Sequence, residues 1–474
     1  EPREQNLGDL KAHGGDLASR LGSLFDDTGR AGTFVRETTL DLLGYAARRI
    51  PEVMGNPANV DRAIRWGFAW QLGPFETWDA LGFERVLEAM QEHGIAVPEW
   101  VEQMRADGHT QFYREQGGAR QVYVPEEEGY VDDERAADEI SLAAVKTDPS
   151  NELWANEDAA LLDLGDGVAL YEFRSKANSL GQTVMQGLRE VIEKVEHDPN
   201  LRGLVIGNEG KNFSVGANLG EMVMAAAQGQ FDVIGRFIEG FQQTIQRVRF
   251  ARKPVVVATH QRVLGGGCEM TMACPNPVLA AETYIGLVEL GVGLIPAGTG
   301  TMRLAALASR RALDYDSHLQ PLVQHYYENV AMAKVAESAV QAKAMGFAAP
   351  HAAVVMNAER RFHVAKQEVL RLSEQGYLPP PVEMHISVLG RPGRAALGVG
   401  VYQFHQGGYI SDYDRFLADR LAYVITGGDL SGPQEVTEDY LLELEREVFL
   451  SLLGEEKTKE RIMHILEHNK PLRN

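Results

Sequence analysis

The chain has little cysteine and no long apolar run. Its two cysteines, Cys268 and Cys274, lie six positions apart among 474 residues, which gives neither a disulfide framework nor a CxxC metal pair. A reduced, cytoplasmic setting is the expectation. No apolar run reaches the roughly 18 residues that suggest a membrane span. The chain opens with Glu1-Pro-Arg-Glu4, without an initiator methionine or an apolar signal region, so we expect a processed or partial chain.

Excess basic charge and a dinucleotide-binding fingerprint are also lacking. The 46 basic and 67 acidic residues give a formal net charge of −21, which argues against general nucleic-acid binding. The segments Gly291-Val-Gly293, Gly298-Thr-Gly300 and Gly398-Val-Gly400 each lack the third glycine of a G-x-G-x-x-G motif. We therefore expect no nicotinamide-binding domain within this chain.

Length and texture predict more than one domain, because 474 residues exceed one ordinary core. In chain order we expect helical residues 1–115, an acidic linker at 116–154, an alternating core at 155–310 and a helical region at 311–474. Within the linker, residues 122–124 suit an exposed hairpin. An aromatic group is interpreted as helical core, and its members are Trp66, Phe68, Trp70, Phe75 and Trp78.

Strand and helix patterns alternate in the region 155–310, which predicts an α/β domain with crossover connections. Short apolar or alternating runs predict strands at 159–164, 168–173, 204–206, 254–259, 277–281 and 284–287. Helical spacing predicts helices at 182–197, 231–252 and 297–307, and further on at 335–345, 355–375 and 413–425, followed by a charged pair of helices within 435–468.

One segment carries the strongest functional signal. Leu264-Gly-Gly-Gly-Cys-Glu269 follows the apolar run Pro254-Val-Val-Val-Ala-Thr259, an order that predicts a buried strand, a glycine turn and a helix with a carboxylate in its first turn. Glycines let backbone N–H groups at a helix N-terminus approach a ligand closely, and the helix dipole favours negative charge there. Such a site can stabilise an oxyanion that forms on an acyl carbonyl.

Two glutamates and a second glycine loop extend this site. Glu289 follows the 284–287 strand, and a return strand can bring it beside Glu269. Asn212-Phe-Ser-Val-Gly-Ala-Asn-Leu219 also opens a helix through a glycine and offers a backbone N–H near Ala217. Addition of water to a double bond conjugated to a thioester needs two amides for the carbonyl oxygen and carboxyl groups that move protons. Each feature alone has a plain structural explanation, and their combination is specific.

These blocks resemble the signature of the crotonase (enoyl-CoA hydratase) superfamily. The resemblance covers roughly residues 155–310 and rests on Phe213-Ser-Val-Gly-Ala-Asn218, the 264–269 block, Glu289 and Leu294-Ile-Pro296. It implies a ββα spiral core with flanking helices. It also implies oxyanion-hole amides at Ala217 and Gly266, with Glu269 and Glu289 as the acid/base pair.

The resemblance further implies residues that contact the substrate. Phe173-Arg-Ser-Lys-Ala-Asn-Ser-Leu180 is similar to the family's CoA-contacting loop, which makes Lys176 and Ala177 candidates together with Asn218 and Gly265. Asn218 stands where the family has aspartate, a departure that concerns helix capping more than chemistry. His260 stands where the family often has asparagine and is interpreted as structural.

The flanks are similar to a second family. Residues 60–68 and 72–82 resemble the C-terminal helical domain of 3-hydroxyacyl-CoA dehydrogenases, although Phe34-Val-Arg-Glu37 replaces the segment with the substrate-contacting asparagine. This helical copy is therefore interpreted as structural. With residues 408–412 and 440–453, the layout resembles the C-terminal part of a bacterial bifunctional 3-hydroxyacyl-CoA dehydrogenase/enoyl-CoA hydratase.

The resemblance implies an enoyl-CoA hydratase of fatty-acid β-oxidation, which adds water syn to a trans-2-enoyl-CoA and yields 3-hydroxyacyl-CoA. It implies an acyl-CoA substrate, no metal, and a need for NAD only if a Rossmann domain lies upstream. A homo-oligomer or a thiolase partner is the expected assembly. An enoyl-CoA isomerase, a non-catalytic scaffold that binds CoA esters and a retained dehydrogenase activity stay open as alternatives.

Overall fold

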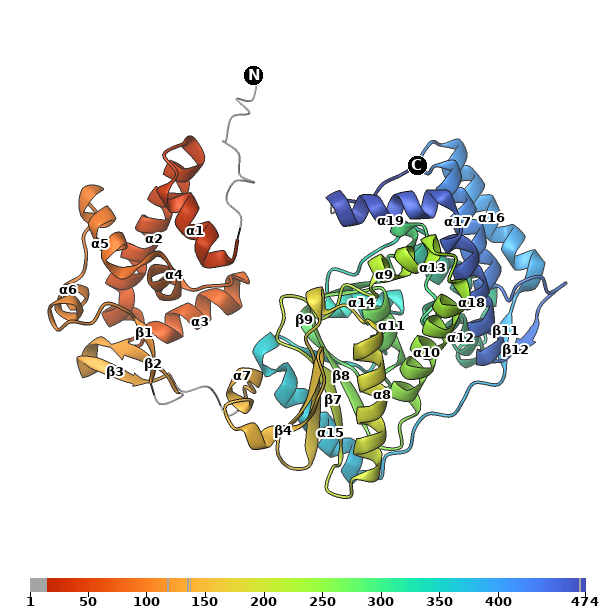
Figure 1. Cartoon of the computed structure of the whole chain (residues 1–474), viewed down its shortest axis with the longest axis horizontal. Coiled ribbons are helices and arrows are strands. Elements are labelled where there is room, and N and C mark those ends of the chain that lie inside the picture. Colours follow the sequence, from red (N-terminus) through yellow and green to blue (C-terminus); the bar gives the residue numbers. More distant parts are fainter. Residues whose placement is uncertain (1–14, 117–118, 134–135, 137, 469) are drawn as a thin grey trace. The chain divides into compact units, whose positions relative to one another are not determined.

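The computed structural model describes residues 15–116, 119–133, 136, 138–468 and 470–474. Its contacts divide the chain into two compact units, residues 1–136 and 137–474 (Figure 1). The boundary falls inside the segment that the sequence suggested as a linker.

The first unit consists of helices followed by a small antiparallel sheet in the order β1-β2-β3. Its helices are α1 (Leu17–Asp26), α2 (Arg30–Val53), α3 (Pro57–Phe68), α4 (Pro74–Leu81), α5 (Phe83–Glu92) and α6 (Glu99–Ala106). Its strands are β1 (Tyr113–Gln116), β2 (Ala119–Val124) and β3 (Gly129–Asp132), with the turn η2 (Pro125–Glu127) before β3. The predicted helical character of this region is present, and the sheet is an addition to it.

The aromatic group of this unit is only partly core. Phe75 and Trp78 are fully buried, but the side chains of Trp66, Phe68 and Trp70 are 46–69% exposed. The reason is the end of α3, where Ala69 adopts a left-handed backbone with φ of 54° and the chain turns. The interpretation of all the aromatic residues as helical core was therefore wrong for these three.

The expected linker at 116–154 is structured on both sides of the boundary. Val122 and Tyr123 lie on the central strand β2, which pairs with both β1 and β3 in antiparallel hairpins. The predicted hairpin is therefore present, but these residues are buried and not exposed. The acidic run 126–128 occupies the tight turn between β2 and β3. Further on, residues 142–145 and 152–155 belong to the second unit as α7 and β4. Acidic composition misled the prediction, because the charges lie in turns between apolar strand residues.

The second unit is built on a mixed sheet in the order β10-β9-β8-β7-β6-β5-β4. Its strands are β4 (Glu152–Ala155), β5 (Ala159–Asp163), β6 (Val168–Phe173), β7 (Gly203–Gly207), β8 (Val255–Leu264), β9 (Val278–Gly286) and β10 (Ala353–Val355). Pairing is antiparallel from β4 to β6 and parallel from β6 to β10. Helices connect the parallel strands, which confirms the predicted α/β class with crossover connections.

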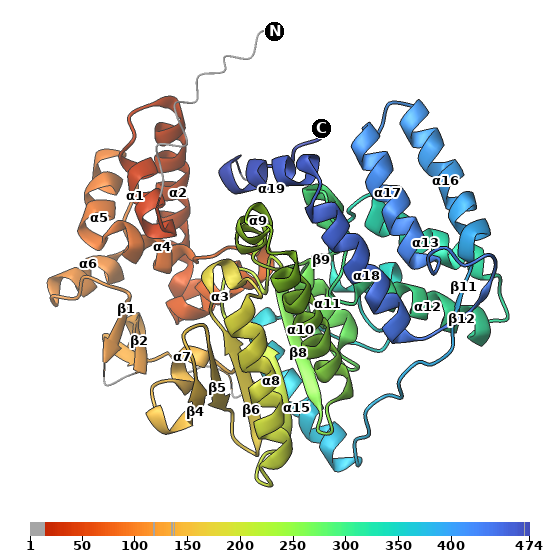
Figure 2. The ribbon, with the colours of Figure 1, turned by 45° about the vertical axis from the view of Figure 1, so that its right-hand side comes forward.

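Helices cover both faces of this sheet (Figure 2). They are α7 (Leu142–Val145), α8 (Gln182–His197), α9 (Leu219–Ala227), α10 (Phe231–Phe250), α11 (Gly266–Ala273) and α15 (Arg361–Glu374). On one face, Phe362 and Val369 of α15 pack with Leu170 and Val205. Strand β10 joins this sheet and α15 packs on its face. Both come from the predicted C-terminal helical region, so the core does not end at residue 310.

The remaining helices pack beside the sheet and against one another. They are α12 (Gly300–Asp314), α13 (Leu319–Ala331), α14 (Ala339–Met345), α16 (Gly390–Gln406), α17 (Asp412–Ile425), α18 (Glu438–Leu453) and α19 (Glu456–His468). Shorter elements are η3 (Pro149–Asn151), η4 (Lys176–Asn178), η5 (Glu289–Val292), η6 (Ala358–Arg360), β11 (Ile386–Val388) and β12 (Gln434–Val436). Within the described residues, no helix combines the length and the apolar character that a membrane span requires.

Candidate active site

The glycine turn between β8 and α11 depends on the absence of a side chain at Gly265. Its φ of 54° and ψ of −123° lie in a region that L side chains rarely adopt. A Cβ atom built there would lie 3.1 Å from Glu289 Oε1 and 3.6 Å from the Cα atom of Gly216. Gly265 therefore lets the Glu289 carboxyl and the second glycine loop approach the start of α11 together.

Two backbone amides meet at this turn. The loop that carries Ala217 runs along the end of β8, where the Leu264 N–H donates to the Ser214 carbonyl at 2.9 Å. A Cβ atom on Gly216 would lie 3.6 Å from the nitrogen of Gly266. Within the described residues, neither the Ala217 nor the Gly266 N–H donates to a protein acceptor. Two such amides at a helix N-terminus can hold a developing oxyanion.

Glu269 projects from the first turn of α11 into the interior. Its Oε1 accepts hydrogen bonds from the Gly298 N–H at 2.7 Å and from the Gly300 N–H at 2.8 Å. Burial raises the pKa of Glu269 to about 7, against the opposing effect of these two amides. The carboxyl group is therefore poised to exchange a proton near neutral pH.

Glu289 begins η5, directly after β9. Its Oε2 is buried and has no hydrogen-bond partner among the described residues. Such an oxygen costs about 1–3 kcal/mol unless a ligand or water pairs with it. Burial raises the pKa of Glu289 well above its ordinary value, and the negative charge of Glu269 raises it further. Two buried carboxyl groups whose pKa values are both raised can supply an acid and a base.

The candidate CoA-contacting residues lie on an adjoining turn. Lys176 and Ala177 are exposed on η4. The next residue, Asn178, donates to the Asn212 carbonyl at 2.8 Å, and its own carbonyl accepts from Ser214 Oγ at 2.8 Å. The turn is thus fixed to the loop that supplies the Ala217 amide.

Asn218 and His260 have local structural contacts. Asn218 occupies the N-cap position of α9 but makes no capping hydrogen bond, and its side chain instead donates to Glu221 Oε1 at 2.7 Å. His260 is buried, with Nε2 2.6 Å from the Gly210 carbonyl. Burial, assisted by the charge of Arg361, lowers the pKa of His260 to about 3, so this imidazole is neutral near pH 7.

The C-terminal helices supply residues that the sequence analysis missed. Glu445 of α18 accepts the Met302 N–H at 2.7 Å. From α19, Thr458 Oγ1 donates to the Gly293 carbonyl at 2.6 Å, and Arg461 donates to the Leu290 carbonyl at 3.2 Å. These contacts join positions 143–171 residues apart, beyond the reach of any local motif.

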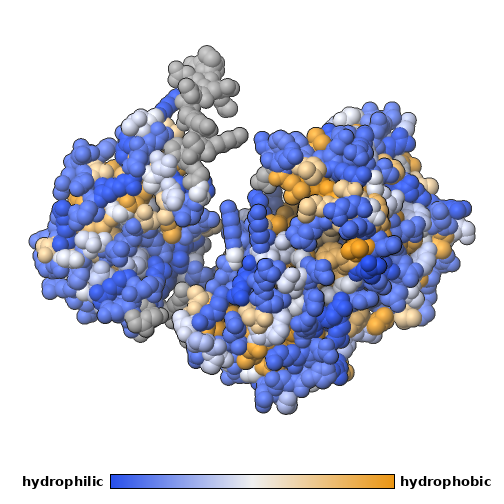
Figure 3. Space-filling model, viewed as in Figure 1, coloured by the Kyte–Doolittle hydropathy of each residue, from blue (hydrophilic) through white to orange (hydrophobic). Residues whose placement is uncertain are grey.

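Apolar side chains reach the surface beside the site. Helix α19 packs against both α9 and η5, the elements that follow Ala217 and begin with Glu289. Met224 on α9 and Met463 and Leu466 on α19 are exposed, and Figure 3 shows hydrophobic surface in this part of the second unit. An apolar margin of this kind suits an acyl chain.

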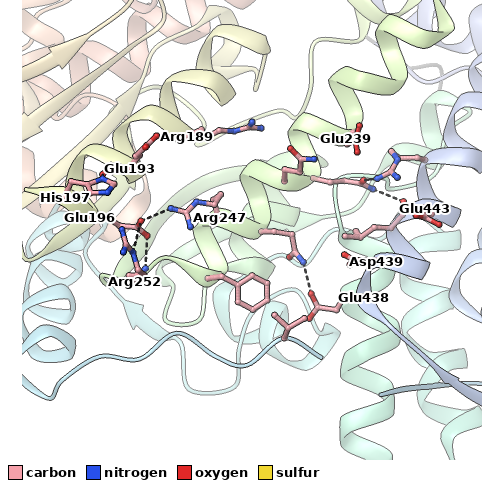
Figure 4. Close-up of a pocket in the computed structure, with 17 residues that line it drawn as sticks. Arg189, Glu193, Glu196, His197, Glu239, Arg247, Arg252, Glu438, Asp439 and Glu443 are labelled. Carbon is pink, nitrogen blue, oxygen red and sulfur yellow. Dashed lines mark hydrogen bonds and ion pairs between the residues drawn. The ribbon is translucent and has the colours of Figure 1, made fainter. Parts of the chain in front are cut away.

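A separate cleft of about 960 Å³ lies between α8, α10 and α18. Figure 4 shows its charged lining, in which Glu196 pairs with Arg247 at 2.8 Å and with Arg252 at 3.3 Å. The lining includes neither Glu269 nor Glu289, so this cleft is not the carboxyl site. In the described part of the chain, no group of three or more His, Cys, Asp or Glu residues is arranged to hold a metal ion.

Comparison with known proteins identifies the fold that surrounds this site. Residues 164–314 match the enoyl-CoA hydratase/isomerase family, and this part of the chain is a domain of that family. The match contains both glycine loops, Glu269 and Glu289.

The curated relatives extend over more of the chain. A probable 3-hydroxyacyl-CoA dehydrogenase of Bacillus subtilis is 38% identical over 458 residues, which are 96% of this chain and 56% of that protein. A putative fatty acid oxidation complex trifunctional enzyme of Rickettsia prowazekii is 24% identical, covering 64% of this chain and 39% of that protein. A probable enoyl-CoA hydratase of B. subtilis is 31% identical over 147 residues, covering 31% of this chain and 56% of that protein. The chain thus spans about half the length of these relatives.

Proposed function

We propose that the second unit is an enoyl-CoA hydratase that converts a trans-2-enoyl-CoA into a 3-hydroxyacyl-CoA in fatty-acid β-oxidation. The observation that carries the proposal is a pair of buried carboxyl groups. Glu289 lies against Gly265 with its Oε2 lacking a hydrogen-bond partner among the described residues, and Glu269 is held by the amides of Gly298 and Gly300. The names of the relatives, a hydratase and a fatty acid oxidation enzyme, support the reaction and the pathway.

The geometry suggests the role of each group. The thioester oxygen accepts from the Ala217 and Gly266 amides, which stabilise the enolate that forms as water adds. The Glu269 carboxylate takes a proton from water while the water oxygen bonds to the β-carbon. The protonated Glu289 gives its proton to the α-carbon. A proton that passes from Glu269 back to Glu289 restores both groups.

The same proposal gives the flanking residues and partners their places. Lys176, Ala177, Asn218 and Gly265 contact the CoA thioester around the amide pair. No step of the reaction calls for NAD or a metal. Dehydrogenase chemistry belongs to a nicotinamide-binding domain, whose fingerprint the glycine pairs of this chain do not complete. We propose further that the protein assembles with a thiolase or with further copies of itself, in the cytoplasm.

The direct test follows the absorbance of crotonyl-CoA, which falls when the conjugated double bond is hydrated. We expect turnover by the protein and a loss of about 10²–10⁴-fold in Glu289→Gln, because the acid is removed. Glu282→Gln changes an exposed carboxylate of β9 and is the matched control. Near wild-type turnover by Glu289→Gln would remove Glu289 from the mechanism. Binding of crotonyl-CoA without turnover would favour a scaffold, and faster conversion of a 3-enoyl-CoA would favour an isomerase.

A further inference from the structure

Residues 298–302, which include the end of the loop before α12 and the first turn of that helix, donate alternate amides to two carboxyl groups. Glu269 accepts the N–H groups of Gly298 and Gly300. Glu445 accepts the Thr299 N–H at 3.1 Å through Oε2 and the Met302 N–H at 2.7 Å through Oε1. The amides that face Glu269 are therefore oriented by a backbone that Glu445 holds from the other side.

Glu445 is itself fixed by side chains beneath it. It is fully buried and accepts from Gln242 Nε2 at 3.3 Å. Gln242 also donates to the Ala297 carbonyl at 2.9 Å, and its own Oε1 accepts from Arg446 at 2.7 Å. Glu445 is thus joined through one side chain to both the loop and the charged cleft lined by Gln242 and Arg446.

Charge links Glu445 to the proposed acid and base. Burial raises the pKa of Glu445 to about 8, and the charge of Glu269 on α11 contributes to the rise. The charge of Glu445 in turn raises the pKa of Glu289 on η5. The guanidinium of Arg303, on the neighbouring α12, pairs with Glu438. Arg446, on α18 beside Glu445, donates a hydrogen bond to Gln242. The carboxyl groups therefore act on one another with the adjacent cations already engaged.

We propose that Glu445 is a positioning residue for Glu269, holding residues 298–302 at the start of α12 so that two amides stay directed at the proposed base. This inference rests on the proposed hydratase function. A buried carboxyl group is costly unless its hydrogen bonds are complete, and Glu445 achieves this by fixing the loop that Glu269 also uses. Gly298 and Gly300 have no side chains of their own to anchor them.

The test compares Glu445→Gln with Glu438→Gln. Glutamine at position 445 keeps the side-chain volume. It replaces one acceptor oxygen with an NH₂ group, which then faces a backbone N–H donor of Thr299 or Met302. Glu438 lies on the same helix and is equally buried, yet it contacts Arg303, Gln246 and the Glu383 amide. Glu438→Gln is expected to lower the thermal stability without changing the kinetics of the folded enzyme. If Glu445 is merely structural, Glu445→Gln will behave in the same way.

For Glu445→Gln we expect kcat to fall about 10–100-fold, as for other small misplacements of catalytic groups, while KM for crotonyl-CoA changes by less than about twofold. The pH–rate profile should narrow from both sides. The acid limb should shift to higher pH, because weaker amide contacts let the pKa of Glu269 increase. Glu445 is mostly protonated where Glu269 titrates, so the loss of its charge offsets this increase only slightly. The alkaline limb should shift to lower pH, because Glu289 loses a neighbouring charge. Unchanged kcat with both limbs in place would overturn the proposal.

Infrared titration of the buried carboxyl groups gives a readout independent of turnover. The Glu269 signal, assigned by its loss in Glu269→Gln, should titrate at higher pH in Glu445→Gln than in the wild type. If the Glu269 signal titrates at the same pH in Glu445→Gln and in the wild type, the positioning role is rejected, whether or not the wild type has hydratase activity. Absence of hydratase activity in the wild type would reject only the proposed function. Glu445→Asp, which keeps the charge with a shorter reach, replaces the glutamine variant if that variant does not fold, and the same upward shift is expected.

Discussion

The ionised form of Glu269 should destabilise the folded protein, and Glu269→Gln isolates that cost. The rise of its pKa from 4.5 to about 7 corresponds to about 3–4 kcal/mol, at about 1.4 kcal/mol per pKa unit. The folded state binds this proton more tightly than the unfolded state. The stability that the proton contributes is therefore complete below about pH 4.5 and is lost as the pH rises through about 7.

Glutamine keeps the carbonyl oxygen that the Gly298 and Gly300 amides require, and it cannot ionise. Its new NH₂ group can cost about 1–3 kcal/mol if it lacks an acceptor, but this cost is the same at every pH. The difference in unfolding free energy between variant and wild type should therefore shift by about 3 kcal/mol in favour of the variant between about pH 5 and about pH 8.

Urea unfolding followed by far-ultraviolet circular dichroism at both pH values measures this shift. Glu282→Gln, an exposed change on the adjoining strand, should give no pH-dependent difference. The same Glu269→Gln protein should lose about 10²–10⁴-fold of its turnover of crotonyl-CoA. A stability difference that is identical at the two pH values would refute the claim that burial holds the Glu269 pKa near neutrality.

The remaining predictions concern the elements that hold the carboxyl groups. Gly265→Ala should lower kcat by about 10²-fold, because its Cβ atom lies against the Glu289 carboxyl group. Gly229→Ala is the control, because Gly229 also has a positive φ but no neighbour within 4 Å, and its kcat should be unchanged. Arg461→Met should lower the unfolding free energy by about 1.5–3 kcal/mol, because it removes the 2.8 Å ion pair with Asp414 and leaves that carboxylate with the Ser411 amide as its remaining donor. Urea unfolding of that variant checks the loss, and unchanged stability would contradict it.

Local patterns were sufficient for the elements that carry the glycine turn. Helix α8 has the bounds predicted from its apolar spacing, and β8, Gly265 and α11 follow in the predicted order. The strand runs on to Leu264, five residues beyond its predicted end. These features depend on periodicity, on β-branched residues and on glycine, which act over a few residues at a time.

Predictions failed where a distant partner decided the structure. The segments 277–281 and 284–287 suggested two strands, but they form the single strand β9. Its partner β8 has an irregular residue, Gln261, with φ of 49°, and the pairing register shifts there. At this irregularity β9 carries Ala281 and Glu282, which are not buried, so the apolar run of one continuous strand is interrupted in the sequence.

Glu445 illustrates a signal that was present but had no visible target. It occupies the buried stripe of α18 with Leu441, Val448 and Leu452, where a charge in an apolar periodicity calls for a specific partner. The spacing of α18 identifies the glutamate as unusual, yet the amides that it holds lie more than 140 residues earlier. Helix α18 holds the residues whose amides bind Glu269, and α19 holds the turn of Glu289 through Arg461. The C-terminal helices therefore contribute to the position of both carboxyl groups.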